Sequence, residues 1–276
     1  MRPPVRPGSW AARLAVAILV TGLALPLLWV VLSSFVPEAT LFAGGGLLPH
    51  HLVLDHYRAL FRERDFWVPV RNSLVVAGAT TLLCLLLGAP CAYALARLRF
   101  RGRTLLLSFV LAVAMFPQIS IVSPLFLLLR ALGLLDSYPG LVLPYCTFAM
   151  PLAVWLLTGY FRQLPPELEE AAYVDGAGRI RTFREIVLPA SLPGLVTTGI
   201  LTFLYSWNEF LFALSFTTGP DRRTVPVAIT LFRGRYQVPW GEILAAVVVA
   251  TLPVALLVLL FQRRIVGGLT SGAVKG

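Results

Sequence analysis

The chain has 276 residues, of which 58% are hydrophobic and 13% charged, and its mean hydropathy is +0.81. Soluble domains carry roughly 25% charged residues, so this composition excludes a water-soluble globular protein and predicts a polytopic membrane protein. The net charge of +10 does not indicate nucleic-acid binding, because the arginines stand in short clusters at the ends of apolar runs, where basic residues set membrane orientation.

Six apolar segments are long enough to cross a membrane as helices, for which about 20 mostly apolar residues suffice. They cover approximately residues 13–34, 72–97, 104–130, 139–161, 191–216 and 243–262. The first follows a basic N-terminus, as in a signal peptide, but its apolar run is too long and no cleavage site follows, so an uncleaved span is predicted. The predicted fold class is therefore an all-α polytopic membrane protein with six transmembrane helices.

These segments divide the chain into three predicted parts. Residues 1–71 contain the first transmembrane helix and an extracytoplasmic loop. Residues 72–265 form a five-helix transmembrane domain with a polar loop at 162–190, and residues 266–276 form a C-terminal tail. With six spans both termini lie on one side, and the loops on that side carry more basic residues than the loops on the other. Because basic residues favour the cytoplasmic face, both termini and the polar loop are expected there.

Several kinds of chemistry lack a supporting motif. The three cysteines (Cys84, Cys91 and Cys146) lie inside apolar runs without CxxC spacing, so buried small residues are favoured over a disulfide or a metal site. The three histidines, at positions 50, 51 and 56, share one outer loop, which favours a solvated loop over a metal site. The only lysine is Lys275, next to the last residue, so a nucleotide-binding P-loop is excluded. The chain is predicted not to be an enzyme on its own.

The polar loop at 162–190 reads as a helix–turn–helix elbow. Prolines 165 and 166 suit a helix start, and the acids that follow them are favoured by the helix dipole. Apolar residues at helical spacing predict one apolar face, and they are Leu164, Leu168, Ala171 and Ala172. The glycines at 176 and 178 end this helix, and a second helical piece, Ile180 to Val187, precedes Pro189. An ordinary amphipathic connector between two spans is the alternative.

The same stretch resembles the EAA loop of ABC importer permeases. The matching positions are Glu170, Ala171, Ala172, Gly176, Ile186, Leu188 and Pro189, with Asp175 inside the pattern. Two further stretches, residues 207–210 (WNEF) and the tail 262–276, resemble the MalG-like permeases of carbohydrate ABC importers. The resemblance covers essentially the whole chain and is most specific over residues 72–276.

The resemblance implies a type I ABC importer permease fold in the bacterial cytoplasmic (inner) membrane. It also implies three kinds of protein partner within the lipid-embedded complex: a second, MalF-like permease, two ABC ATPase subunits, and an extracytoplasmic sugar-binding protein. The chain itself would need no cofactor, since ATP is bound by the ATPase partner, and it would bind no nucleic acid. By resemblance, Glu170 would contact the ATPase and Gly176 would form the turn that lets the elbow dock.

Sugar recognition needs aromatic faces together with amide or hydroxyl groups. The candidates inside the predicted spans are Gln118, Ser120, Tyr145, Thr147, Tyr205, Trp207, Asn208 and Glu209. For each of them, hydrogen bonding between helices is the alternative role. Two other functions also fit the residues: an ABC permease for another polar solute, such as glycerol phosphate, a polyamine or a peptide, and an ion-coupled carrier. Glu209 is the only carboxylate inside a predicted span, a thin basis for the carrier.

Overall fold

The structure is a computed structural model that describes residues 10–41, 52–232 and 238–273, with side chains up to residue 262. Every regular element in these residues is a helix, which confirms the all-α prediction. Four described helices are long and apolar enough to cross a membrane. They are α1 (Trp10–Ser33), α3 (Trp67–Arg97), α6 (Tyr138–Gln163) and the first part of α13 (Trp240–Ala273), from Trp240 to Gln262.

The two other predicted spans are not single straight helices. Residues 104–130 form α4 (Arg103–Ala114) and α5 (Gln118–Ala131), which are bent by 88° relative to each other. Pro117 stands before α5 with an extended backbone, and its ring cannot continue α4 because it lacks an N–H group. The span predicted over 104–130 is therefore a bent pair of helices and not one straight helix.

The fifth predicted span is also divided. Residues 191–216 form α10 (Leu192–Trp207) and α11 (Leu211–Phe216), and α10 is bent by 75° from the helical stretch Arg179–Ala190 that precedes it. The chain reaches six candidate spans when each bent pair is counted as one span.

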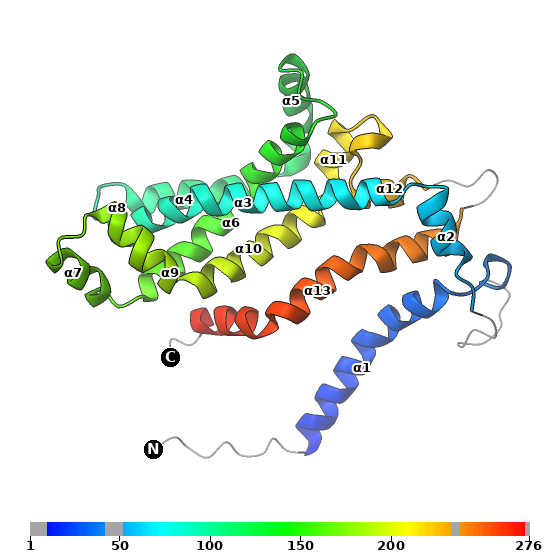
Figure 1. Cartoon of the computed structure of the whole chain (residues 1–276), viewed down its shortest axis with the longest axis horizontal. Coiled ribbons are helices and arrows are strands. Elements are labelled where there is room, and N and C mark those ends of the chain that lie inside the picture. Colours follow the sequence, from blue (N-terminus) through cyan, green and yellow to red (C-terminus); the bar gives the residue numbers. More distant parts are fainter. Residues whose placement is uncertain (1–9, 42–51, 233–237, 274–276) are drawn as a thin grey trace. The chain divides into compact units, whose positions relative to one another are not determined.

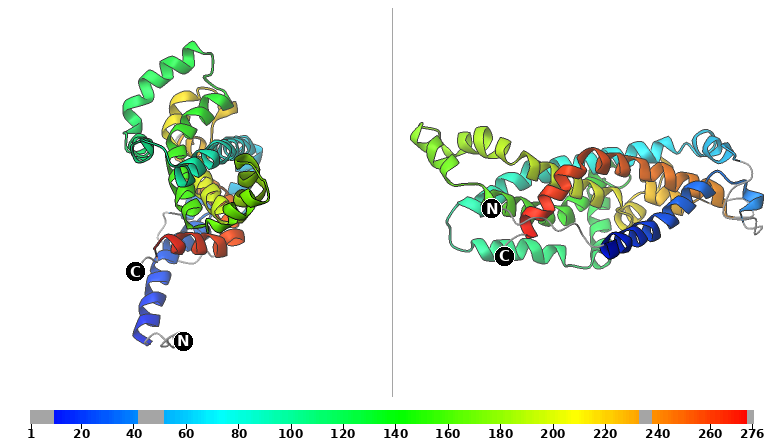
Figure 2. Two further views of the ribbon diagram at one scale, coloured as in Figure 1. Left: turned by 90° about the vertical axis from the view of Figure 1, so that its left-hand side faces the viewer. Right: turned by 90° about the horizontal axis from the view of Figure 1, so that it is seen from below.

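The helices fall into two compact units. The smaller unit contains residues up to 66 together with 231–252, and the larger contains 67–230 and the residues from 253 onward. In the larger unit α3, α6 and α10 lie side by side and form the core (Figures 1 and 2). Ala92, Leu157 and Phe161 are fully buried where α3 meets α6. At the base of α10 a Cβ atom on Gly194 would stand 2.5 Å from the ring of Tyr160, so only glycine permits this close approach.

The smaller unit is held together by polar contacts to the start of α13. The carboxylate of Glu38, in the short helix η1 (Glu38–Thr40), accepts hydrogen bonds from the backbone N–H groups of Trp240 (2.9 Å) and Gly241 (2.7 Å). These N–H groups begin a helix and have no partner within it, so Glu38 acts as a cap supplied from a distant part of the sequence. Arg64 and Glu242 form an ion pair at 2.8 Å in the same unit.

The loop after α1 contains the short helix α2 (Asp55–Arg62), with Leu60 fully buried. His56 on this helix lies with Nε2 2.8 Å from the carbonyl oxygen of Val36. The histidines at positions 50 and 51 lie outside the described residues.

In the larger unit, Asp136 and Asn72 join α3 and α6 to residues 217–224, and we call this set the 217–224 junction. Asp136, between α5 and α6, accepts hydrogen bonds from the backbone N–H groups of Thr218 (2.6 Å) and Gly219 (3.1 Å) and from the hydroxyl of Thr218. The 217–224 segment includes the short helix η3 (Pro220–Arg222) and leads into α12 (Val225–Thr230).

Asn72 supplies the second half of the junction from α3. Its amide nitrogen donates to the carbonyl oxygens of Asp221 (2.8 Å) and Arg223 (3.0 Å), and its amide oxygen accepts from the hydroxyl of Tyr138 (2.8 Å). Asn72 is fully buried, so these bonds replace the water it has lost. One side chain thereby fixes α3, the start of α6 and the segment before α12.

The carboxyl group of Asp136 makes the junction dependent on pH. Burial opposes its ionisation, but hydrogen bonds from Thr218 and Gly219, with the nearby charge of Arg222, hold its pKa below the ordinary value of 3.8. A folded-state pKa below the unfolded value means that the ionised group stabilises the fold above the ordinary pKa. This stabilisation is lost as the pH falls through the lowered pKa.

We expect Asp136→Asn to lower the free energy of unfolding by about 1–3 kcal/mol at pH 7, because an amide oxygen is a weaker acceptor than a carboxylate. The difference from the parent chain should shrink as the pH is lowered below about 4, where the parent carboxylate also becomes protonated. Thermal unfolding in detergent between pH 7 and pH 3 measures both effects. Asp221→Asn, at an exposed side chain of the same segment, is the control. A difference that stays constant over this range would contradict the assignment.

Candidate functional site

Residues 167–190 form an elbow at one end of the larger unit, beyond the ends of α3 and α6 (Figure 1). Its first arm is α7 (Glu167–Val174). Its second arm consists of α8 (Arg179–Thr182), the π-helical turn η2 (Phe183–Val187) and α9 (Leu188–Ala190), and leads into α10. The predicted helix–turn–helix arrangement is thus present, with the break between residues 175 and 178.

The turn of the elbow depends on Gly176. This residue has a φ of +81°, in the left-handed region that favours glycine. Its N–H donates to the carbonyl oxygen of Tyr173 (3.1 Å), and the N–H of Ala177 donates to that of Ala172 (2.9 Å). These two bonds form a Schellman motif, which ends a helix and reverses the chain. No atom lies within 4 Å of the place where a Cβ would stand, so the requirement for glycine comes from the backbone alone.

The structure places the predicted coupling residues on different faces of the elbow. Exposed residues are Glu170, Ala171, Asp175, Gly176 and Pro189; Ile186 and Leu188 are half-buried, and Ala172 is buried. Of the predicted apolar face, Ala172 is buried and Leu164 packs against the core, whereas Leu168 and Ala171 point to the surface. The inward face of α7 carries Glu169 and Ala172, three residues apart on one side of the helix.

Glu169 is the functional candidate that the sequence did not single out. Its carboxylate lies 2.7 Å from Nε of Arg97, the last residue of α3, and accepts a hydrogen bond from the hydroxyl of Tyr93 (2.9 Å). The available signal was that Tyr93 and Arg97 stand four residues apart on one helix face. Nothing local linked them to an acid in a later loop.

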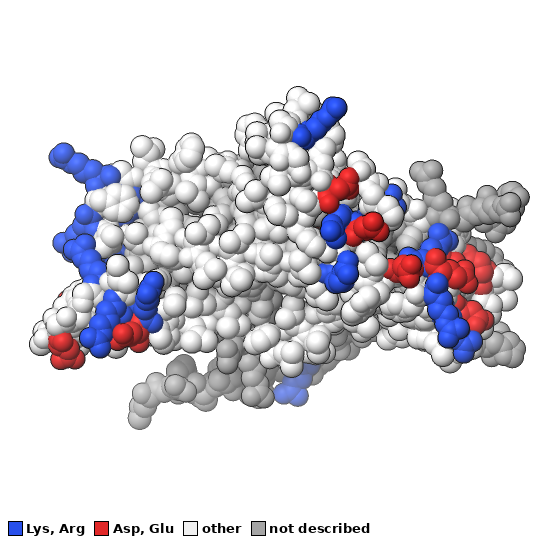
Figure 3. Space-filling view, turned by 45° about the horizontal axis from the view of Figure 1, so that its top comes forward, with Lys and Arg blue, Asp and Glu red and all other residues white. Residues whose placement is uncertain are grey.

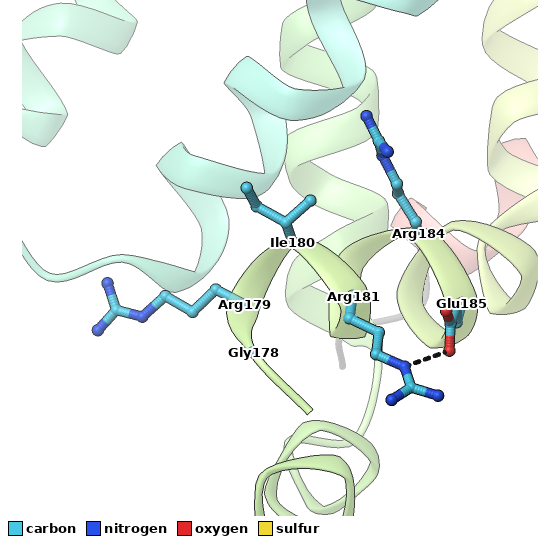
Figure 4. Close-up of a pocket in the computed structure, with 6 residues that line it drawn as sticks. All are labelled: Gly178, Arg179, Ile180, Arg181, Arg184 and Glu185. Carbon is cyan, nitrogen blue, oxygen red and sulfur yellow. Dashed lines mark hydrogen bonds and ion pairs between the residues drawn. The ribbon is translucent and has the colours of Figure 1, made fainter. Parts of the chain in front are cut away.

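The outward side of the second arm offers a groove of about 740 Å³, drawn in Figure 4. Its lining residues are Gly178, Arg179, Ile180, Arg181, Arg184 and Glu185. Arg181 points to Glu185 and pairs with it at 2.9 Å, while Arg179 and Arg184 extend in different directions and take no part in that pair. Ile180 is 71% exposed and Val174, on the first arm, 87%. The elbow therefore presents cations and bare apolar side chains together.

A second candidate site lies where α5, α10 and α11 meet. A cavity of about 560 Å³ is lined by Gln118, Tyr205, Asn208 and Glu209, with Leu204, Phe210 and Leu211. Four of the predicted pathway residues thus come together, although Gln118 belongs to a different helix from the rest. The amide nitrogen of Gln118 donates to the hydroxyl of Tyr205 at 2.5 Å, which joins α5 to α10.

Glu209 and Asn208 occupy the break between α10 and α11. The carboxylate of Glu209 accepts hydrogen bonds from the N–H groups of Phe212 (2.7 Å) and Ala213 (3.1 Å), which begin α11. The amide nitrogen of Asn208 donates to the carbonyl oxygen of Leu204 (2.8 Å) near the end of α10. Glu209 satisfies N–H groups that the break would leave unpaired, whereas the carbonyl of Leu204 also accepts from the backbone N–H of Asn208 (3.2 Å). Asn208 remains exposed, whereas Glu209 is buried.

The other predicted pathway residues do not line this cavity. Tyr145 is fully buried on α6, and Trp207 is 3% exposed and stacks on Phe203 with ring centroids 5.7 Å apart. Both therefore pack the interior in this conformation. Ser120 and Thr147 are exposed but lie away from the cavity lining.

Among the described residues no group of three or more His, Cys, Asp or Glu side chains is placed to hold a metal ion. The three cysteines are free thiols; Cys84 is buried, and Cys91 and Cys146 are half-buried. The polar groups of the two candidate sites are amides, hydroxyls, carboxylates and guanidinium groups, which suit contacts to a polar solute or to a protein surface.

The chain belongs to the family of binding-protein-dependent transport system inner membrane components, whose model matches residues 84–270. It is therefore an ABC importer permease subunit, a transport component of the membrane and not an enzyme, as predicted. The matched residues include the elbow, the residues that line the cavity, the core helices α6 and α10, and the second part of α3.

Several curated permeases are similar over nearly the whole chain. The trehalose transport system permease protein SugB of Mycobacterium tuberculosis is 48% identical, covering 94% of this chain and 95% of that protein. The trehalose/maltose transport system permease protein MalG of Thermococcus litoralis is 43% identical, covering 91% of each. The sulfoquinovosyl glycerol transport system permease protein SmoH of Agrobacterium fabrum is 42% identical, covering 94% of this chain and 91% of that one.

A solved structure confirms the type I importer permease fold. A chain of a bacterial ABC transporter involved in the import of the acidic polysaccharide alginate matches with a TM-score of 0.78 and 22% identity. The match covers 95% of this chain and 99% of that chain. A chain from the alginate transporter in complex with an alginate pentasaccharide-bound periplasmic protein matches with a TM-score of 0.68 and 17% identity, covering 91% of each.

We expect Gly176→Ala to reduce the substrate-stimulated ATP turnover of the assembled importer without preventing membrane insertion. A side chain in the left-handed region costs about 1–2 kcal/mol, a factor of roughly 5–30 in the population of the native turn. Gly178→Ala is the matched control, because Gly178 also has open space around its Cβ position but an ordinary φ of −75°. Equal turnover for the two variants would show that the turn geometry does not matter.

Proposed function

We propose that the chain is the permease through which a binding-protein-dependent ABC importer moves a sugar or oligosaccharide across the bacterial cytoplasmic membrane. The observation that carries this proposal is identity of 42–48% over more than nine-tenths of the chain to permeases named for trehalose, maltose and a sulfoquinovosyl glycerol. The cavity at the α10–α11 break supports it, since an amide, a phenol and a second amide line one space. Such groups exchange hydrogen bonds with sugar hydroxyls.

Glycerol phosphate, polyamines and peptides remain outside this proposal because no relative above is named for them. The cavity lining also holds no basic residue to bind the phosphate of glycerol phosphate. The family assignment argues against an ion-coupled carrier, because the family consists of components of binding-protein-dependent transport systems. The sole candidate residue for such a carrier, Glu209, already caps α11 with both carboxylate oxygens.

The energy for transport would come from outside the chain. Two ATPase subunits would bind ATP, so the permease itself would need no cofactor, and a second permease would complete the pathway. An extracytoplasmic binding protein would deliver the sugar, in keeping with the description of the family. Membrane lipid would surround the permease. We propose no role for nucleic acid.

The elbow would be the surface on which an ATPase subunit docks. Glu170, Asp175 and Gly176 are exposed together around the turn, and Val174 and Ile180 offer apolar contacts on either side of it. Exposed apolar side chains beside cations are typical of a protein–protein interface, in which an apolar centre is surrounded by charge. The half-buried Ile186 and Leu188 would support the second arm from within, and the exposed Pro189 would lie on its surface.

The elbow and both termini are proposed to face the cytoplasm. In the larger unit, arginines gather over the end that carries α7 and α8, and a broad uncharged band separates them from the charges of the 217–224 junction (Figure 3). The exposed arginines of that end are Arg99, Arg101, Arg162, Arg179, Arg181 and Arg184. Such an excess of basic residues marks the cytoplasmic side.

We expect Asn208→Ala to slow uptake of labelled trehalose or maltose, in proteoliposomes that contain the complete importer, by roughly 2- to 10-fold for each hydrogen bond lost to the sugar. Basal ATP turnover should stay unchanged, because the elbow is untouched. Ser120→Ala is the control, since Ser120 lies on the neighbouring helix α5 but does not line the cavity. Uptake that is equal in the two variants would remove Asn208 from the pathway.

One labelling experiment tests both the orientation and the docking surface. A membrane-impermeant maleimide should react with Val174→Cys only in inside-out vesicles and with Asp221→Cys only in right-side-out vesicles. Added ATPase subunits should protect the cysteine at position 174 alone. The parent chain, whose native cysteines are buried or half-buried, sets the background. Reaction of both variants from the same side would contradict the orientation, and labelling at 174 that ATPase does not slow would contradict docking.

A further inference from the structure

One acid of α7 points inward while its neighbours point outward. Glu167 and Glu170 are exposed, but Glu169 retains only 7% of its accessible surface. A carboxylate is rarely buried unless it is paired, because the loss of hydration is costly. Glu169 must therefore have a specific partner within the chain.

That partner is the end of α3. Nε of Arg97 lies 2.7 Å from one carboxylate oxygen of Glu169, and the two side chains are 16% and 9% exposed. The hydroxyl of Tyr93, one helical turn earlier, donates to the other carboxylate oxygen at 2.9 Å. Both oxygens of Glu169 are thus held by one face of a single membrane helix.

The same residues also reach α6. Nη2 of Arg97 donates to the carbonyl oxygen of Leu164 at 2.6 Å, where α6 ends and the elbow begins. The ring of Tyr93 packs edge-on against Phe161 of α6, with ring centroids 6.0 Å apart. Arg97 and Tyr93 therefore contact the first arm of the elbow and the helix from which that arm emerges.

The second arm converges on the same place. Phe183, the first residue of the π-helical turn η2, lies 4.9 Å from the ring of Tyr93 and 6.3 Å from that of Phe161, between centroids. Both arms are consequently anchored to one cluster of side chains on α3 and α6. A displacement of either arm has to move or break this cluster.

The geometry points to Glu169, Arg97 and Tyr93 as the positioning residues that transmit movement of the elbow to the membrane helices α3 and α6. The inference rests on the proposed docking of the elbow on an ATPase, and it assigns the two adjacent acids separate tasks. Glu170, which is exposed, would face the partner. Glu169 would carry the displacement inward, because a buried ion pair that also accepts a hydrogen bond from Tyr93 resists extension more than apolar contact does.

A neutral variant separates transmission from docking. In an importer assembled in proteoliposomes, Glu169→Gln should still bind the ATPase subunits and hydrolyse ATP. The quantity expected to fall is labelled trehalose or maltose transported per ATP hydrolysed, within the roughly 5- to 150-fold range usual for coupling between sites. Glu167→Gln, in the same helical turn but exposed, is the matched control and should keep the parent ratio. A merely destabilised protein would lower transport and hydrolysis in proportion and leave the ratio unchanged.

Two further variants keep the test decisive if Glu169→Gln fails to assemble. Tyr93→Phe preserves the aromatic packing and removes one hydrogen bond, so it should lower the transport-to-hydrolysis ratio in the same direction but less. The exchange Glu169→Arg with Arg97→Glu restores opposite charges and should recover part of the ratio lost in Glu169→Arg alone. If Glu169→Gln assembles and transports as much sugar per ATP hydrolysed as the parent chain, the inference is overturned. If Glu169→Gln does not assemble, the same result for Tyr93→Phe overturns it.

The failure of transmission can be told apart from the failure of docking. Glu170→Lys should abolish co-purification of the ATPase subunits, while Glu169→Gln should not. If Glu170→Lys still co-purifies with them at the parent level, the docking proposal itself is wrong. If docking responds as expected and the transport-to-hydrolysis ratio does not respond to Glu169 or Tyr93, only the transmission role is wrong.

Discussion

The structure depends on one constraint: a chain in hydrocarbon has to satisfy its backbone polar groups internally, which makes every regular element of the described residues a helix. Where helices break, polar side chains take over the lost bonds. Glu209 caps the start of α11, and Asn208 holds a carbonyl group of α10. The cavity that we assign to the pathway opens at this break. Irregular backbone at membrane depth is tolerated where it lines a cavity, so the break and the cavity are one feature.

The same rule governs both ends of the larger unit. At the 217–224 junction, buried Asn72 has partners on two segments, and Asp136 accepts hydrogen bonds from the N–H groups of Thr218 and Gly219. At the elbow, buried Glu169 is paired by Arg97 and Tyr93. In each case polar side chains join a membrane helix to a segment outside the core: Asn72 joins α3 to residues 217–224, and Glu169 joins the elbow to α3. Through these contacts, a displacement of the outer segment would pull on the membrane helix.

The elbow combines two faces with different demands. Its outward face keeps Val174 and Ile180 in the open, which costs solvation unless a partner covers them. Its inward face holds a buried charge, which tolerates little displacement because an unpaired charge away from water is unfavourable. Gly176 joins the arms with a backbone that other residues resist. An element with an exposed outward face and an inward face fixed by a buried ion pair is suited to transmitting a partner's motion to the membrane helices.

The sequence by itself determined the class of protein, the helical content, the existence of the elbow and the position of its turn. These follow from the lengths of the apolar runs, from the positions of glycine and proline, and from the spacing of apolar residues. Each of these signals can be seen within a short stretch of sequence. Local patterns could not reveal that residues 104–130 bend by 88°, nor which face of α7 turns inward. They assigned Leu168 and Ala171 to an apolar face, whereas the tertiary structure leaves both exposed and turns Glu169 inward. The reason is that Arg97 and Tyr93 come from a distant helix, and the pairing of a buried charge outweighs the small gain from burying an alanine.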